Sequence, residues 1–295
     1  MEKNRIEVLK TYKLYIGGKF PRTESGRYYA PRDERDEILA NVCLSSRKDF
    51  RNAVVAARAA FGSWSNRTAY NRSQILYRIG EILEGRKAQF EAELVRQGSS
   101  KKAAAQEVNL AIDRLVYYAG WCDKYQQVAG TINPVASAHF NFSVPEPMGV
   151  VAIFADQQTS LIGLVSAMAP VIAGGNTCVV LASESKPLCA ITFSEVLNDS
   201  DVPGGVVNIL TGKTEEIIGH AAVHMDVNAI VYHGDEKGDI KLLEEKSVAN
   251  VKRIRHYSEN WLDQLAQSLY HITDLQEIKT TWHPIEKIGG SAPGY

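Results

Sequence analysis

Five short strand-like runs, separated by four segments of helical periodicity, dominate residues 150–257 and restrict the possible folds. The runs cover 150–155, 177–181, 206–210, 229–233 and 251–257. Helices are expected between them at about 160–174, 187–198, 214–223 and 236–247. Strands that alternate with helices connect by right-handed crossovers into a parallel sheet, and continuous Val-rich strands suit a sheet buried on both faces. The sequence therefore predicts an α/β fold around a five-stranded parallel sheet.

A helical layer is expected ahead of this sheet. Apolar residues recur at a spacing of three or four within 47–64, 71–96 and 101–125, which predicts three amphipathic helices. Such helices need a sheet or other helices to cover their apolar faces. Before them, residues 12–46 are predicted to form an extended arm that begins with a short hairpin, YKLYIGGKF, turning at Gly17 and Gly18.

The bulk composition excludes several classes of partner. The net charge of −1 gives no long-range attraction to nucleic acid or to an anionic membrane. No run of apolar residues is long enough to span a bilayer, and the charged N-terminus lacks the apolar core of a signal peptide. The 4 cysteines are few and lack metal-binding spacing. We therefore expect a cytoplasmic protein with reduced cysteines and no metal.

A polar cluster interrupts the apolar pattern in GVVAIFADQQTSLIG, residues 149–163. The first apolar run stops at Asp156, Gln157, Gln158 and Thr159, and a helical pattern follows. In an open α/β sheet this junction is where ligands usually bind. The cluster is alternatively explained by turn chemistry, with Asp156 or Thr159 capping the next helix.

Several long motifs resemble the aldehyde dehydrogenase superfamily, and the resemblance runs nearly without gaps from about residue 12 to 257. The motifs are YIGGKF at 15–20, AARAAFGSW at 56–64, AIDRLVYYAGW at 111–121, PEPMGVVAI at 145–153, LVSAMAPVIAGGNTCVVL at 164–181 and VPGGVVNILTG at 202–212.

The resemblance implies a Rossmann-like domain and a small antiparallel oligomerisation sheet, built from a hairpin and a closing strand. It also implies a catalytic domain, which we expect to be missing between the fifth strand and the closing strand. The expected divisions are an N-terminal arm with helices at 1–125, an oligomerisation hairpin at 126–147, a Rossmann-like core at 148–260, and a linker with the closing strand at 261–295. The ending resembles the degenerate second module of the two-module aldehyde dehydrogenases.

The resemblance implies chemistry for which this sequence lacks residues. The family attacks its aldehyde with a cysteine thiolate, which would belong to the missing domain. Cys178 lies in an apolar run and Cys189 in a predicted helix, so both are expected to be small buried hydrophobes. The family's general base aligns near Tyr257, and Glu259 is expected to be a surface carboxylate. We therefore expect no catalytic residue in this chain.

The cofactor site implied by the resemblance is degenerate. Ser183 stands where a ribose-binding lysine is expected, Thr214 replaces a glycine, and Asp235 would place a carboxylate near a pyrophosphate. We therefore expect no cofactor, or NAD(P) at low affinity. The positions carried over to this degenerate site are Ala155, Gln158, Ser183, Glu184, Gly212, Thr214, Gly234 and Asp235.

Two strand-like segments are predicted to form the oligomerisation sheet. Residues 137–144 alternate, which places Phe140 and Phe142 on one face, and 272–282 is the closing segment. The apolar positions of the closing segment are Ile272, Leu275, Ile278 and Trp282. The sheet is either covered locally or a docking edge for a full-length aldehyde dehydrogenase, with a rearranged homodimer as the alternative partner.

Three functions remain open from the sequence. The first is a catalytically inactive aldehyde-dehydrogenase-like protein that acts in assembly or regulation. The second is an oxidoreductase component that still binds NAD(P) and needs a partner to supply the cysteine. The third is a small-molecule or nucleotide sensor that uses the altered crevice.

Overall fold

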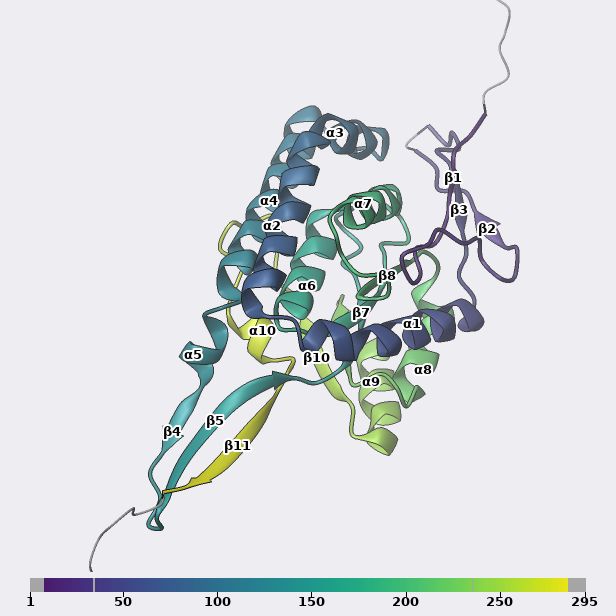
Figure 1. The fold of residues 1–295 in the computed structure, drawn as a ribbon. Helices are drawn as coiled ribbons and strands as arrows, with labels where there is room; N and C mark the ends of the chain where they lie inside the picture. Colours follow the sequence, from purple (N-terminus) through teal and green to yellow (C-terminus); the bar gives the residue numbers. More distant parts are fainter. Residues whose placement is uncertain (1–7, 34, 235, 286–295) are drawn as a thin grey trace, which may run out of the picture.

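A computed structural model describes residues 8–33, 35–234 and 236–285, and its centre is a five-stranded parallel sheet (Figure 1). The strand order is β10-β9-β6-β7-β8, which confirms the predicted α/β fold. The strands are β6 (Val150–Phe154), β7 (Thr177–Leu181), β8 (Val207–Leu210), β9 (Ala229–His233) and β10 (Arg253–Tyr257). The order in which successive strands are added reverses at β6, because β7 and β8 lie on one side of it and β9 and β10 on the other.

Helices cover both faces of the sheet (Figure 1). On one face, side chains of α1 (Arg47–Ser65), α8 (Thr214–Val223) and α9 (Lys237–Ser247) pack with Val150, Ala152 and Phe154. The alternate side chains, Val151 and Ile153, face the other helices. These helices are α2 (Ala69–Gly85), α3 (Lys87–Arg96), α4 (Lys101–Trp121), α6 (Ile162–Ala173) and α7 (Leu188–Asp199). Strands β6 to β9 are therefore buried on both faces, as continuous apolar runs predict, whereas the edge strand β10 is partly exposed.

The single helix predicted over 71–96 is wrong, because the chain breaks it between Gly85 and Lys87. Glycine lowers the helix propensity at this point. Arg86, between the two helices, turns its guanidinium to Glu195 of α7. The predicted helix over 101–125 likewise ends at Trp121, and a short α5 (Tyr125–Ala129) follows.

The predicted N-terminal hairpin is present, but the arm behind it is more structured than an extended chain. Gly17 and Gly18 both have a positive φ, and the amide of Ile16 donates to the carbonyl of Lys19. The arm also forms a three-stranded sheet in the order β1-β3-β2, which the sequence analysis did not predict. Its strands are β1 (Thr11–Tyr12), β2 (Tyr28–Tyr29) and β3 (Asn41–Cys43).

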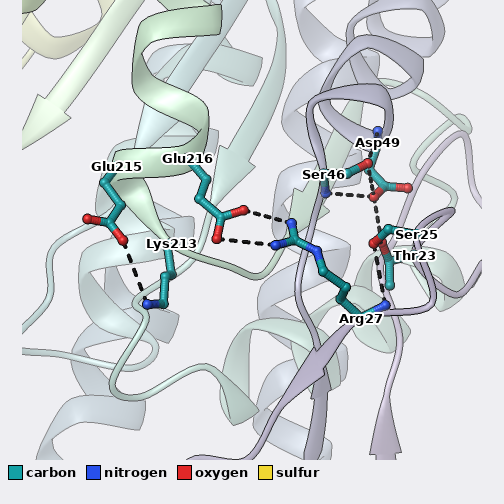
Figure 2. A network of polar contacts seen from close by, with 8 residues as sticks. All are labelled: Thr23, Ser25, Arg27, Ser46, Asp49, Lys213, Glu215 and Glu216. Atoms are coloured by element: carbon teal, nitrogen blue, oxygen red, sulfur yellow. Dashed lines mark hydrogen bonds and ion pairs between the residues drawn. The ribbon is translucent and has the colours of Figure 1, made fainter.

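Charged side chains fix the arm to the body of the protein (Figure 2). Arg27 Nη2 lies 2.7 Å from Glu216 Oε2 in the first turn of α8. Thr23 Oγ1 donates to Asp49 Oδ2 at 2.6 Å, and the amide of Ser46 donates to the same oxygen at 2.8 Å. Ser46 and Asp49 form a capping box at the start of α1, so a single carboxylate joins the arm to a helix terminus.

A third sheet, which is antiparallel, extends away from the body in the order β11-β5-β4 (Figure 1). Its strands are β4 (Thr131–Asn133), β5 (His139–Pro147) and β11 (Gln276–Pro284). The register pairs Phe142 with both Ile132 and Thr281. The prediction of a small antiparallel sheet closed by the C-terminal strand is therefore confirmed.

The closing strand begins later than predicted. Ile272 lies in a short helix, α10 (Tyr270–Thr273), and Leu275 precedes β11; both side chains are buried in the main core. The backbone is held there because Asn176 Nδ2 donates to the carbonyl of Leu275 at 2.8 Å and Gln276 Nε2 donates to that of Gly174 at 3.2 Å. Ile272 and Leu275 are therefore not exposed on the small sheet, in contrast to the prediction.

Candidate ligand crevice

Two adjoining cavities open at the carboxyl ends of β6 and β9, where the strand order reverses. This is the position at which open α/β sheets bind ligands. We call the cavity lined by Glu184, after β7, the β7-side cavity, and the cavity lined by Trp261 the Trp261 cavity. Their volumes are about 410 Å³ and about 300 Å³. The residues common to both linings are Asp156, Gln158, His233 and Gly234. The β7-side cavity adds Phe154, Ala155, Gln157, Glu184, Thr214, Tyr232, Glu236 and Asp239. The Trp261 cavity adds Thr159, Tyr257, Ser258, Glu259, Asn260, Trp261 and Leu262.

The polar cluster after β6 forms a tight turn. Asp156 Oδ1 accepts the amide of Gln158, and its Oδ2 accepts the amide of Thr159, both at 3.0 Å. Thr159 Oγ1 in turn accepts the amide of Gly163 at 3.0 Å. The turn chemistry expected for Asp156 and Thr159 is therefore present.

The main cap of α6 is a residue that the sequence analysis missed. Glu107, on α4, is buried, and its Oε1 accepts the amides of Ser160, Leu161 and Ile162 at 3.0, 2.7 and 3.2 Å. A carboxylate at a helix N-terminus satisfies free amide groups and complements the helix dipole. In the sequence, the signal for this role was a glutamate placed among the apolar positions of an amphipathic helix.

The turns after β6 and β7 are bonded to each other. Gln157 Oε1 accepts the amide of Glu184 at 2.8 Å, and Ser183 Oγ donates to the carbonyl of Gln157 at 3.3 Å. Lys186 Nζ donates to the carbonyl of Gln158 at 2.6 Å. The buried Ser183 and the ammonium of Lys186 thus serve these turns and line neither cavity.

The β7-side cavity is acidic. Asp156, Glu184, Glu236 and Asp239 bring four carboxylates to it, and no lysine or arginine is among its described lining residues. Glu236 and Asp239 lie at the N-terminus of α9, where an anion would otherwise be favoured. Tyr232 Oη donates to Asp239 Oδ2 at 2.9 Å. This lining fits a pyrophosphate poorly, because like charges meet in a partly desolvated crevice.

The structure brings five of the eight predicted cofactor positions together around the β7-side cavity. These are Ala155, Gln158, Glu184, Thr214 and Gly234. Ser183 is turned inward, and Asp235 lies outside the described residues.

Gly212 also lies outside the two linings, and the arm explains its conformation. Its φ is +152°, and a Cβ there would lie 3.1 Å from the amide nitrogen of Ser45. The close approach of the arm therefore requires glycine at this position.

The four cysteines are free and buried, and none lines either cavity. Cys178 and Cys189 are fully buried, as expected from the sequence. Burial raises the pKa of the Cys122 thiol to about 12 and that of Cys189 well above its ordinary value. Such thiols are poor nucleophiles at neutral pH.

Neither a metal site nor a membrane span is found in the described part of the chain. In residues 8–33, 35–234 and 236–285 no group of three or more His, Cys, Asp or Glu side chains could hold a metal ion. Over the same residues, every helix is too short or too polar to cross a bilayer.

The small sheet presents two chemically different faces. The alternation of the strands places Ile132, Phe140, Phe142 and Val144 together, and we call this the apolar face. The rings of Phe140 and Phe142 lie 5.6 Å apart on it. The opposite face carries hydrogen bonds between Asn133, Asn141, Ser143 and Thr280, together with Ile278 and Trp282. The four predicted oligomerisation residues that lie on the small sheet therefore divide between its two faces, Phe140 and Phe142 on one, Ile278 and Trp282 on the other.

Comparison with known proteins places the chain beside enzymes of one family. The model of the "Aldehyde dehydrogenase family" matches residues 21–256. The Bacillus subtilis (strain 168) protein DhaS, whose name assigns it provisionally to the aldehyde dehydrogenases, is 31% identical over 250 residues, which cover 83% of this chain and 50% of DhaS. The cytosolic 10-formyltetrahydrofolate dehydrogenase of Mus musculus is 30% identical over 256 residues, covering 85% of this chain and 28% of the mouse protein. The chain spans about half or less of the length of these relatives.

Solved structures agree with the observed fold. PnpE from Pseudomonas sp. WBC-3 superimposes with a TM-score of 0.80 at 26% identity, covering 84% of this chain and 50% of PnpE. The NAD⁺ complex of an aldehyde dehydrogenase from Bacillus cereus gives a TM-score of 0.79 at 24% identity, with the same coverage of 84% and 50%.

Proposed function

The chain belongs to the aldehyde dehydrogenase family, and from that premise we propose that it is a non-catalytic member that associates with a full-length aldehyde dehydrogenase. The burial of all four thiols away from the crevice supports the lack of catalysis. The free state of the thiols supports a cytoplasmic location.

The connection between β10 and β11 supports a shortened form of the family fold. Residues 258–275 lead directly from the last strand of the parallel sheet into the closing strand of the small sheet. In the family architecture, the catalytic domain lies between these two strands. We propose on this basis that the chain resembles the degenerate module of the two-module enzymes.

The small sheet is the observation that carries the docking proposal. Within the described residues β11 pairs only with β5, so its other edge offers unpaired backbone groups. The sheet also exposes part of its apolar face: Ile132, on the opposite edge strand β4, is 72% exposed, and Phe140, on the central strand β5, is 43% exposed. A sheet with an open edge and exposed apolar side chains on one face favours docking of a partner by strand addition.

A full-length relative fits this surface better than a second copy of the chain. The aligned part of DhaS is 50% of that protein, so such relatives carry a further half that this stretch does not match. That half could supply the sheet onto which the small sheet adds. In a homodimer, two copies of the small sheet would have to pair with each other, and this rearranged homodimer is the alternative outcome.

The experiment is co-purification of the tagged chain from its native cell, followed by reconstitution with the recovered protein in purified form. We expect a full-length aldehyde dehydrogenase, identified by mass spectrometry, and a complex that survives gel filtration. Phe140→Asp on the apolar face should weaken the complex by at least about tenfold, because it places a charge in a desolvated contact. Val55→Asp is the matched control, since Val55 is 57% exposed on α1, outside the small sheet. A stable monomer with no such partner would refute the proposal.

Cofactor binding is the second proposal. We propose that NAD(P) binds weakly or not at all, because the β7-side cavity has four carboxylates. Titration calorimetry with NAD⁺ and NADP⁺ should give a Kd of about 1 mM or weaker. Low-micromolar binding would instead favour an oxidoreductase component that needs a partner to supply the cysteine. The positions of Glu184 and Gly234 at the cavity support this alternative.

A further inference from the structure

The Trp261 cavity contains a buried side chain that lacks polar partners. His233, at the end of β9, is 4% exposed, and neither Nδ1 nor Nε2 has a hydrogen-bond partner among the described residues. Burying such groups unpaired costs about 1–3 kcal/mol each. Because His233 lines the cavity, a polar group in the cavity is placed to become a partner of the imidazole.

Aromatic rings surround His233. The Trp261 ring lies 5.0 Å from it and the Tyr257 ring 5.5 Å, measured between centroids. Tyr257 Oη is already engaged, donating to Asp274 Oδ2 at 2.9 Å. The wall beside the imidazole is therefore aromatic, and such walls attract organic cations.

The charge of the cavity is negative. Asp156 and Glu259 line it, and its described lining contains no lysine or arginine. Asp156 is stabilised by the amides of its own turn. Glu259 is half-exposed, and its Oε1 contacts His271 Nε2 at 3.4 Å. Burial lowers the pKa of His271, so this partner is mostly neutral at pH 7 and leaves the charge of Glu259 uncompensated.

The buried guanidinium of Arg114 does not line this cavity. Arg114 Cζ lies 5.8 Å from the centroid of the Trp261 ring but lines neither cavity. Its Nη2 donates to the backbone carbonyls of Trp261 and Asp263. Arg114 therefore binds the backbone of the 258–269 segment instead of lining the cavity.

We infer that the Trp261 cavity binds a small hydroxylated organic ammonium compound, with its hydroxyl on His233 and its cationic head beside Glu259 and the aromatic wall. A hydroxyl can donate to the unprotonated nitrogen of the neutral imidazole or accept from its N–H, so it fits either tautomer. The positive head matches the two carboxylates, whereas an anion would be repelled. The volume of about 300 Å³ restricts the class to small molecules. This inference does not depend on the docking proposal.

The test is a calorimetric titration of the full chain with choline, ethanolamine, the neutral isostere 3,3-dimethylbutan-1-ol, and acetate. Choline or ethanolamine should bind at least about tenfold more tightly than the neutral isostere, and acetate should not bind. Glu259→Gln should remove most of that difference. Glu244→Gln, on the exposed surface of α9, is the matched control and should leave the difference unchanged.

His233 is tested in two ways. His233→Phe keeps a ring of similar shape but should weaken choline and the neutral isostere alike, by about tenfold, because both lose the hydroxyl contact. If this variant does not fold, the imidazole nitrogen shifts of the unmodified protein, followed by NMR during choline titration, report the same contact. Equal affinity for the charged and neutral probes, no binding up to about 10 mM, or unmoved His233 shifts at saturation would overturn the inference.

Discussion

Acidification should destabilise the protein through His233, because the folded state keeps this imidazole neutral. Burial, with smaller contributions from positive charge on His271 and His256, lowers the pKa of His233 from 6.5 to about 3. Between these values the unfolded chain binds a proton that the folded chain does not. The free energy of unfolding should therefore fall by about 1.4 kcal/mol for each pH unit below 6.5. The stability is complete above pH 6.5, and about 2 kcal/mol of it is lost by pH 5.

Urea unfolding at several values between about pH 5 and pH 7.5 measures this slope. His233→Phe cannot titrate at this position, so its stability should depend on pH less steeply than that of the unmodified protein, by about 1.4 kcal/mol per unit below pH 6.5. His283→Gln, at an exposed position of β11, is the control and should retain the full slope. If the curves of the unmodified protein and His233→Phe run parallel over this range, the imidazole is not held neutral by burial and the reasoning is refuted.

Three further outcomes are expected. Gly149→Ala should lower the free energy of unfolding by about 3 kcal/mol or more, since φ is +137° and the added Cβ would lie 2.1 Å from Asn228 Oδ1. Gly62→Ala, in α1 and with open space around the added Cβ, should instead raise it by about 0.5–1 kcal/mol. Urea unfolding compares the two variants. Glu107→Ala should cost about 3 kcal/mol in the same assay, because three amides at the start of α6 lose their acceptor; a loss below about 0.5 kcal/mol would contradict this role. A thiol reagent should label none of the four cysteines until urea unfolds the chain, and rapid labelling of the native protein would contradict their burial.

The sequence predicted those parts of the fold that depend on local pattern. The strands of the parallel sheet lie within one or two residues of the predicted runs. In β6 to β9 this is because burial on both faces leaves few polar residues in each strand. The Gly17-Gly18 turn was predictable for a similar reason, since its backbone conformation selects glycine directly.

The remaining features depend on partners that are distant in the sequence. The interruption at Arg86 depends on Glu195, and the cap of α6 depends on Glu107, in another helix. The late start of β11 follows from backbone contacts with Asn176. For the crevice, the turn chemistry of Asp156 was predictable, but the unpartnered imidazole of His233 was not. The suggested cofactor roles remain predictions.

The 258–275 connector links the Trp261 cavity to the proposed docking edge. It provides Glu259 and Trp261 to the Trp261 cavity and then continues without interruption into β11. Asp274, near its end, accepts the hydroxyl of Tyr257, which also lines that cavity. If ammonium binding makes this connector more rigid, ligand binding and docking are coupled. The ligand then changes the affinity of the chain for the docked subunit by some factor, and the docked subunit must change the affinity for the ligand by the same factor. Measuring the choline affinity with and without the partner would determine that factor, and a factor of one would mean that a metabolite signal and assembly are uncoupled in this molecule.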